Sequence, residues 1–181
     1  MAAPAEFLLP NHDGPWTLDD VLALPEDHSQ RIELVDGMLI VSPLGTVRHQ
    51  RLVGRCFSAL HAAATADFEA TIELNVGLSN GRMLIPDFTV VKRTGFDGLL
   101  FPVEDLVLAG EVVSPSSRVN DLILKRELYA AAGVPYYLVI DPKGPAFLLE
   151  LRGVEYVEIA RDADGVLTLD RPFPVTIGLS A

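Results

Sequence analysis

The spacing of apolar and polar residues divides the chain into short apolar runs typical of strands and three segments typical of helices. Residues 17–24 (TLDDVLAL) predict a short helix, with Thr17 as its N-cap and acidic residues in its first turn. Residues 46–64 predict the longest helix, because their apolar positions recur at intervals of three to five residues. These positions are Val47, Leu52, Cys56, Leu60 and Ala63.

Two dipeptides mark hairpins between β-rich runs. Asp36-Gly37 joins RIELV to MLIVSP, and Asn80-Gly81 joins ATIELNVGLS to RMLIPDFTVVKR. Such dipeptides tolerate the positive φ angles of tight hairpin turns. After a loop, residues 106–113 (LVLAGEVV) predict a further strand with an almost continuously apolar sequence.

The segment Ser114-Pro115-Ser116-Ser117 breaks that strand and supplies caps for a helix that runs to about Ala132, before the stop signal Gly133. The run PYYLVIDP predicts the next strand, so residues 106–140 form a strand-helix-strand unit typical of a parallel crossover. Residues 146–151, 154–159 and 166–169 predict a β-meander. This order indicates the α/β (α+β) class, with a mixed central β-sheet flanked by helices.

Length and composition are ordinary for one globular domain. The chain has 181 residues, of which 22% are charged, and we expect residues 1–181 to form a single domain. No apolar run approaches the roughly 20 residues of a membrane helix, and the N-terminal residues lack the pattern of a secretion signal. We therefore expect a soluble, cytoplasmic protein with no membrane partner. The single cysteine, Cys56, excludes an internal disulfide, and GRCFSAL is more typical of an inert helix residue than of a catalytic thiol.

The net charge of −11 argues at first against a nucleic-acid partner. The acidic residues, however, gather at the two ends: residues 1–36 hold eight acids against Arg31 alone, and residues 146–181 hold six acids against three arginines. Residues 37–145 are close to neutral, with 11 acids and 10 bases. The charge therefore only weakly disfavours an anionic substrate.

Two carboxylates interrupt apolar strands. Glu111 lies within LVLAGEVV, and Asp87 lies within MLIPDFTVV directly after Pro86, which cannot donate to a sheet ladder. An unpaired buried carboxylate costs several kcal/mol, roughly, so Glu111 needs a partner.

Strand and helix geometry suggests Lys125 as that partner. Glu111 lies three residues before Ser114, about 10 Å back along the strand at roughly 3.3 Å per residue. Lys125 lies eight residues beyond Ser117, about 12 Å along a returning helix at roughly 1.5 Å per residue. The two side chains are therefore expected at the same level.

Two carboxylates and a lysine at one point suit metal-assisted hydrolysis of phosphodiesters. Carboxylate oxygens suit Mg²⁺ or Mn²⁺, and a lysine can orient the attacking water or stabilise the charge on the phosphorane oxygens. The alternative is a structural Glu111–Lys125 salt bridge, with Asp87 at a strand end in water. The spacing alone favours neither interpretation.

Several motifs resemble a known family. The segments RIELVDGMLIVSP, RHQ, IPDFTVV, LAGEVVSPSS and LKRELYAAAGVPYYLVIDP are similar, in this order, to the bacterial restriction endonuclease-like family, a branch of the PD-(D/E)XK nuclease superfamily. The similarity covers about residues 15–160. It implies the restriction-endonuclease-like fold and Mg²⁺-dependent cleavage of nucleic acid.

The resemblance assigns roles to individual positions. Pro86-Asp87 matches the PD signature and Glu111 matches the acidic position of the second half-motif, so Asp87, Glu111 and Val112 are the expected metal-binding positions. The commonest superfamily pattern has lysine two residues after the acid, where this chain has Val113. In this branch the lysine lies in the next helix, at the position of Lys125.

Two further residues are candidates for the catalytic site. Glu33 matches a recurrent acidic position and could bind metal directly or through water, although a solvated strand residue before a hairpin explains it slightly better. His49, followed by Gln50 near the start of the long helix, could approach a phosphate or the attacking water, whereas a lone histidine is more often a structural hydrogen-bonding residue. Asp141-Pro142 matches the family as well, but a strand-ending turn explains it.

Other features are less specific. A basic stripe on the long helix could contact a phosphate backbone, although a solvated helix face explains it equally well: Arg48, Arg51 and Arg55. The chain has no G-x-x-x-x-G-K-[ST], G-x-G-x-x-G, H-E-x-x-H or G-x-S-x-G motif.

The sequence thus supports two hypotheses. The first is a Mg²⁺- or Mn²⁺-dependent endonuclease that acts on nucleic acid, with DNA as the expected substrate, and that works as a homodimer. The second is a catalytically inactive binding or interaction module that has kept the fold, which the acidic ends and Val113 favour. Convergence of Asp87, Glu111 and Lys125 in one accessible cleft is the observation that separates them.

Overall fold

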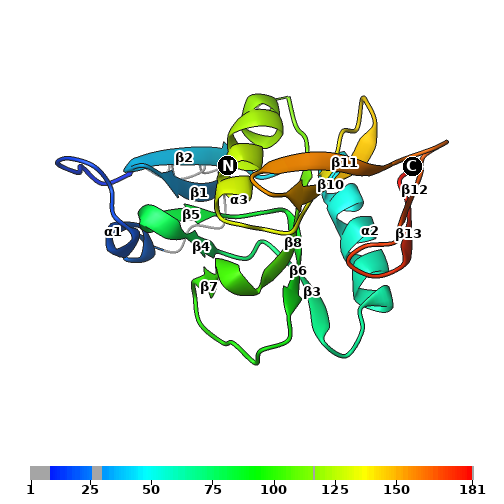
Figure 1. The fold of residues 1–181 in the computed structure, drawn as a ribbon. Coiled ribbons are helices and arrows are strands. Elements are labelled where there is room, and N and C mark those ends of the chain that lie inside the picture. Colours follow the sequence, from blue (N-terminus) through cyan, green and yellow to red (C-terminus); the bar gives the residue numbers. More distant parts are fainter. Residues whose placement is uncertain (1–8, 26–29, 116, 181) are drawn as a thin grey trace.

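A six-stranded sheet forms the centre of the protein (Figure 1). The computed structural model describes residues 9–25, 30–115 and 117–180. The strand order is β11-β10-β9-β8-β6-β3, and the sheet is mixed because β8 and β9 are parallel whereas the other neighbours are antiparallel. The strands are β3 (Phe68–Ile72), β6 (Phe88–Lys92), β8 (Leu106–Val112), β9 (Tyr136–Ile140), β10 (Ala146–Arg152) and β11 (Glu155–Arg161).

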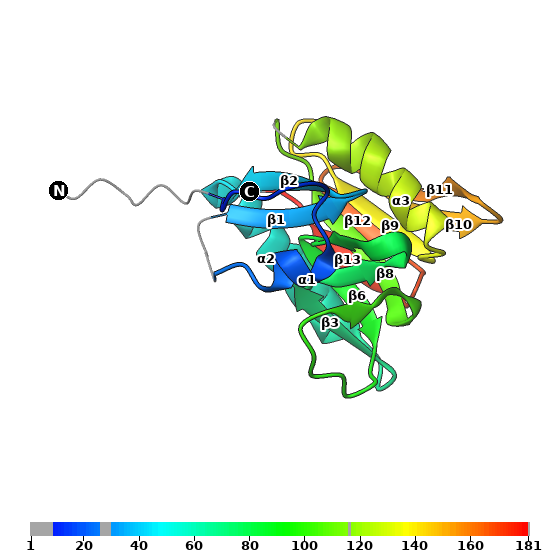
Figure 2. The same ribbon diagram turned by 90° about the vertical axis from the view of Figure 1, so that its left-hand side faces the viewer.

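A second sheet has the order β2-β1-β5-β4-β7 (Figure 2). Its strands are β1 (Gln30–Val35), β2 (Met38–Pro43), β4 (Val76–Leu78), β5 (Arg82–Leu84) and β7 (Phe101–Pro102), with short 3₁₀ turns at Ser79–Gly81 and Val103–Asp105. The turn between β1 and β2 holds Asp36 and Gly37 at positive φ, as the Asp-Gly dipeptide predicts.

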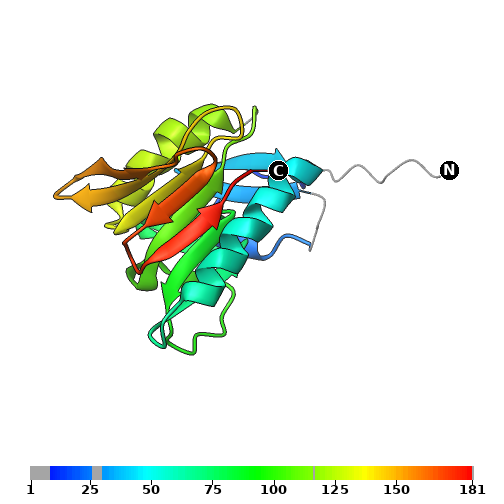
Figure 3. The same cartoon turned by 90° about the vertical axis from the view of Figure 1, so that its right-hand side faces the viewer.

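Helices cover both faces of the central sheet. α2 (Val47–Ala63) lies on one face beside the small sheet of β12 (Val166–Leu169) and β13 (Val175–Gly178) (Figure 3). The opposite face is covered by the crossover helix, which consists of the π-helical segment η3 (Asn120–Leu124) and α3 (Lys125–Ala131). The short helix α1 (Leu18–Leu22) begins after its predicted cap, Thr17, whose side chain accepts from the Asp20 N–H. In the described part of the chain, no helix is long and apolar enough to span a membrane.

The alternation of side chains along β8 fixes the direction of the buried glutamate. Leu108 and Val112 belong to the core under α2, whereas Ala109 and Val113 belong to the core under α3. Because successive side chains of a strand point to opposite faces, Glu111 points toward the crossover helix. All of β8 is buried.

The structure confirms the second predicted hairpin around Asn80-Gly81 but divides it between the two sheets. Residues 70–79 and 82–93 do not form two continuous strands of one sheet; each run leaves one sheet and enters the other, so β3 pairs with β6 and β4 pairs with β5. Glu73, with φ of 50°, and Pro86, which lacks an N–H, interrupt the two runs at the same level. The resulting bend places Asp87 between the two sheets.

The C-terminal meander is also partly corrected. β10 and β11 form the predicted hairpin, but β12 leaves the central sheet and pairs with β13, a strand that the sequence pattern did not predict. Leu167, Leu169, Val175 and Ile177 alternate along these strands and pack against the core under α2. The predicted parallel crossover over residues 106–140 is confirmed, while the predicted cap Ser116 lies outside the described residues.

Candidate active site

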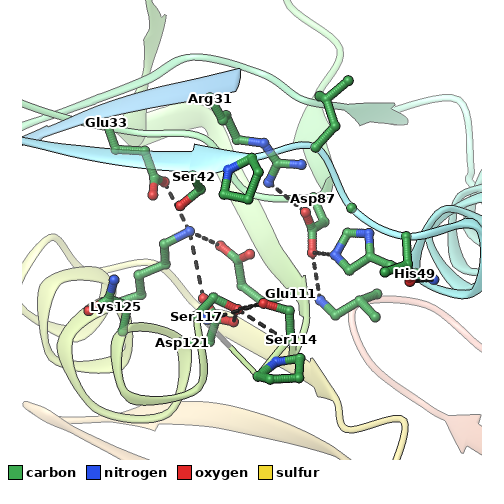
Figure 4. Close-up of a pocket in the computed structure, with 17 residues that line it drawn as sticks. Arg31, Glu33, Ser42, His49, Asp87, Glu111, Ser114, Ser117, Asp121 and Lys125 are labelled. Carbon is green, nitrogen blue, oxygen red and sulfur yellow. Dashed lines mark hydrogen bonds and ion pairs between the residues drawn. The ribbon is translucent and has the colours of Figure 1, made fainter. Parts of the chain in front are cut away.

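A pocket lies where the two sheets meet, between the carboxyl end of β8 and the first turns of α2 and the crossover helix (Figure 4). Its volume is about 170 Å³. The five predicted catalytic residues line it: Glu33, His49, Asp87, Glu111 and Lys125. The structure thus brings together side chains from two strands, two helices and the bend after β5.

Asp87 is buried at this bend and has a hydrogen-bond partner on each oxygen. Its Oδ1 accepts from Arg31 Nη1 at 2.6 Å, and its Oδ2 accepts from the Val112 N–H at 2.7 Å and lies 3.1 Å from His49 Nε2. Burial alone would raise the pKa of Asp87, but His49, Arg31 and the Val112 N–H together lower it to about 2. Asp87 is 2% exposed, so the alternative of a strand-end carboxylate in water is wrong.

Lys125 joins two buried glutamates. Its Nζ donates to Glu111 Oε1 at 2.9 Å and lies 2.9 Å from Glu33 Oε1. Burial would lower the pKa of Lys125, but the charges of Glu111 and Glu33 outweigh burial and raise it. Burial raises the pKa of Glu111; Lys125 opposes this effect, and the neighbouring carboxylates add to it. The lysine therefore stays protonated.

Glu33 is part of the buried network. It is 3% exposed, and its Oε1 also accepts from the Ile85 N–H at 2.7 Å. The interpretation of Glu33 as a solvated strand residue is therefore wrong. The face of β1 that carries Glu33 is therefore directed toward the pocket.

His49 has one bonded and one unbonded ring nitrogen. Nε2 lies 3.1 Å from Asp87 Oδ2, whereas the buried Nδ1 has no hydrogen-bond partner within the described residues. Gly45 packs against the ring so closely that a Cβ there would lie 2.3 Å from Nδ1. Gln50, the next residue, is exposed and does not line the pocket.

The sequence reasoning missed Arg31 as a site residue. Arg31 bonds to Asp87 and lies 3.2 Å from Glu73 through Nη2. A signal was present: Arg31 and Glu33 are two residues apart on one strand and therefore share a face.

Asp121 was also missed. It is 2% exposed, accepts a hydrogen bond from Ser117 Oγ, and has Oδ1 3.8 Å from Lys125 Nζ. Burial raises the pKa of Asp121 to about 6. Its spacing of four residues from Lys125 was the available signal. Asp121 lies in the π-helical segment η3, and Lys125 follows this segment directly. The Lys125 N–H donates to Asn120 O, which is the bonding pattern of a π-helical turn.

The pocket carries an excess of negative charge. Four carboxyl groups line the pocket, together with the cations of Arg31 and Lys125. When all four carboxyl groups are ionised and His49 is neutral, the pocket has an excess of two negative charges. Hard oxygen donors with this excess fit a divalent cation such as Mg²⁺ or Mn²⁺ in charge and in chemistry. Within residues 9–25, 30–115 and 117–180, no group of three or more His, Cys, Asp or Glu side chains is arranged to hold a metal. Oxygens of Asp87 and Glu111 accept hydrogen bonds from cationic side chains and from a backbone N–H.

Other predicted positions lie outside this network. Val112 contributes its N–H to Asp87, and Val113 is buried in the core under α3. Burial raises the pKa of the Cys56 thiol to about 12, which agrees with an inert residue. Asp141 accepts from the Lys143 N–H and thereby closes the turn after β9.

Comparisons with known proteins agree with this architecture. The family model "Uma2: Putative restriction endonuclease" matches residues 18–181. The crystal structure of a "putative nuclease" from Anabaena variabilis ATCC 29413 is similar with a TM-score of 0.69 and 20% sequence identity, over 87% of this chain and 90% of that chain. This similarity confirms the predicted nuclease-like fold, and no curated protein matches the chain. Because the family model matches all but the first 17 residues, this chain belongs to the Uma2 restriction endonuclease-like family.

Proposed function

We propose that the protein is a Mg²⁺- or Mn²⁺-dependent endonuclease that hydrolyses phosphodiester bonds of nucleic acid, with DNA as the expected substrate. The observation that carries this proposal is the convergence of Asp87, Glu111 and Lys125 in one pocket with excess negative charge. In this proposal the chain acts as one domain, in the cytoplasm and as a homodimer, since two sites suit the cleavage of both strands of a duplex.

Asp87 and Glu111 would hold the cation, and Val112 lies beside them. When bound, the cation would polarise the phosphoryl group and lower the pKa of a water molecule. Cation binding needs Glu111 and Asp87 to give up part of their present hydrogen bonds. It would offset the negative charge of the neighbouring carboxylates, which adds to the effect of burial in raising the pKa of Glu111.

Lys125 acts as a fixed cation rather than as a base. Its ammonium group is held by Glu111 and Glu33, and these charges raise its pKa, so it does not take up a proton from water. It can orient the attacking water or stabilise the negative charge that develops on the phosphorane oxygens. His49, held through Nε2 by Asp87, directs its other nitrogen into the space near Gly45.

Plasmid cleavage tests the proposal. The wild type is expected to nick or linearise plasmid DNA with Mg²⁺ or Mn²⁺ and to be inactive in EDTA. Glu111→Gln and Lys125→Met should reduce the rate at least about 100-fold, the scale of loss for one preorganised electrostatic group, whereas Lys92→Met, an exposed lysine outside the pocket, should not. If the wild type is inert on DNA and RNA, or if both pocket variants cleave at the wild-type rate, the proposal is wrong.

Cation binding can be measured without catalysis. A cation that binds the folded state raises the melting temperature, with about 2.7 kcal/mol of added stability at a concentration of 100 times Kd. The rise with Mn²⁺ is expected for the wild type and should be smaller for Glu111→Gln. Size-exclusion chromatography with light scattering tests the homodimer.

The inactive binding module is the second candidate. It is favoured by the occupied state of the site, in which Asp87 is paired with Arg31 at 2.6 Å and Lys125 with two glutamates at 2.9 Å. This candidate predicts no cleavage under any cation and no melting shift that depends on Glu111.

A further inference from the structure

A second pocket adjoins the candidate active site. Its volume is about 460 Å³, and it shares four lining residues with the first pocket: Thr46, His49, Ser114 and Pro115. The two pockets are therefore neighbours on one surface, with His49 between them. A ligand that extends beyond the first pocket can enter the second.

Three exposed cations line this second pocket. Arg48 comes from the first turn of α2, Arg118 from the start of the crossover helix, and Lys143 from the turn after β9. Asp141 is the one acidic residue among the lining residues that the structure describes, so the pocket has an excess of two positive charges.

Two of these cations are held in place. Arg48 Nη2 donates to Pro142 O at 2.8 Å, and Arg118 Nη1 lies 2.7 Å from Asp141 Oδ2. Both bonds fix the guanidinium groups beside the pocket, which lowers the entropy lost when they bind a ligand. Each guanidinium group has further N–H donors for a second partner.

The charge of this pocket is the reverse of that of its neighbour and of the whole chain. The chain carries a net charge of −11, and the candidate active site has an excess of negative charge, so both repel a polyanion. The second pocket offers attraction at the point where a nucleic acid would leave the active site. Its wall also contains Pro115 and Pro142, whose apolar surfaces suit a sugar or a base.

We propose that this second pocket binds the sugar-phosphate backbone of the nucleic-acid strand next to the cleaved phosphodiester, with Arg48, Arg118 and Lys143 contacting phosphates. The proposal rests on the proposed nuclease function and adds the direction in which the strand runs, from Glu111 past His49 toward Asp141. Within the predicted basic stripe of α2, the proposal assigns a phosphate contact to Arg48 alone, because Arg48 lines the second pocket whereas Arg51 and Arg55 line neither of the two pockets.

DNA binding measured without catalysis tests this assignment. Fluorescence anisotropy of a labelled DNA duplex is recorded in EDTA over a range of salt concentrations. The logarithm of the binding constant falls linearly with the logarithm of the salt concentration, and each lost phosphate contact should make this negative slope shallower by about 0.9. This change corresponds to a roughly eight-fold weaker affinity for DNA at 0.1 M salt. Arg48→Ala/Lys143→Ala should therefore lose about two slope units. The matched control, Arg51→Ala/Arg55→Ala, removes the same charge from exposed positions of the same helix and should lose less than half as much.

Lys143→Ala alone guards against a folding defect. Among the described residues, Lys143 forms a hydrogen bond only through its backbone N–H, so this variant should keep the wild-type melting temperature and lose about one slope unit. If the wild type binds DNA and the pocket variants keep its affinity and slope, the backbone site is wrong and the nuclease proposal stands. If binding depends on the pocket but no cation supports cleavage, the nuclease proposal is wrong and the binding site stands. A wild type that binds no DNA at low salt overturns the site.

Discussion

Lys125 Nζ lies 2.9 Å from Glu111 Oε1, although the two residues are 14 positions apart and belong to a helix and a strand. The same nitrogen lies 2.9 Å from Glu33 Oε1, so one buried cation connects β8, β1 and the crossover helix. The pair therefore has a structural role as well as its proposed catalytic one.

Replacing this lysine should cost stability in a manner that depends on pH. Lys125→Met leaves buried carboxylates without their cation and should reduce the free energy of unfolding by about 3 kcal/mol at pH 8. The loss should be smaller at pH 5, because the pKa of Glu111 is raised and the site can take up a proton. Urea denaturation at both pH values measures this. Lys92→Met, at an exposed ion pair, should cost less than about 1 kcal/mol, and an equal cost for both lysines would contradict the prediction.

Arg31 should stabilise the protein through Asp87. Arg31→Met removes the 2.6 Å bond to a buried carboxylate, for an expected cost of about 2 kcal/mol at pH 7. The pKa of Asp87, about 2 in the folded protein, lies below its ordinary value of 3.8, so its contribution is present above pH 3.8 and is lost as the pH falls toward 2. In Arg31→Met this loss should begin at higher pH.

The matched control for Arg31 is Arg82, which forms a pair of similar length, 2.7 Å, with the exposed Asp36. Arg82→Met should cost less than about 1 kcal/mol because water screens this pair. Acid denaturation followed by circular dichroism compares the two variants. The assignment fails if both variants unfold at the same pH and urea concentration.

Asp121 should destabilise the protein at neutral pH. Its pKa is about 6 in the folded protein against an ordinary value of 3.8, so the folded state binds more protons between these values and stability falls as the pH rises through them. At about 1.4 kcal/mol per pKa unit, this loss is about 3 kcal/mol. Asp121→Asn should therefore unfold at higher urea than the wild type at pH 7 and at nearly the same urea at pH 4. A variant less stable than the wild type at pH 7 would argue that the negative charge next to Lys125 is needed.

Gly45 should control the position of His49. A Cβ at Gly45 would lie 2.3 Å from His49 Nδ1, so we expect Gly45→Ala to displace the ring and weaken its contact with Asp87. Cleavage by Gly45→Ala should fall to the level of His49→Ala. Gly54→Ala is the control, because a Cβ at this position of α2 meets nothing within 4 Å, and alanine should add about 1 kcal/mol of helix stability. Equal cleavage by the two alanine variants would contradict a role of Gly45 in positioning His49.

The sequence by itself determined the local elements and the two anomalous carboxylates. Asp36-Gly37 specified the first hairpin, Thr17 and Thr46 the starts of two helices, and the apolar run around Glu111 a buried strand. These signals are local, because turn dihedrals, capping and the period of apolar residues depend on neighbours in the chain. The fixed rise per residue of a strand and of a helix even predicted that Lys125 and Glu111 lie at the same height along the crossover unit.

The tertiary structure decided what surrounds those residues. The bend at Glu73 and Pro86 divides one ribbon between two sheets, and only this division brings Arg31 and Glu33 of β1 to Asp87 and Lys125. Burial and neighbouring charges then set the pKa of Asp87 and of Asp121: hydrogen bonds from His49 and the charge of Arg31 hold the pKa of Asp87 below its ordinary value, and burial raises the pKa of Asp121. Such values depend on the sum of contacts from several segments, which no local pattern in the sequence encodes.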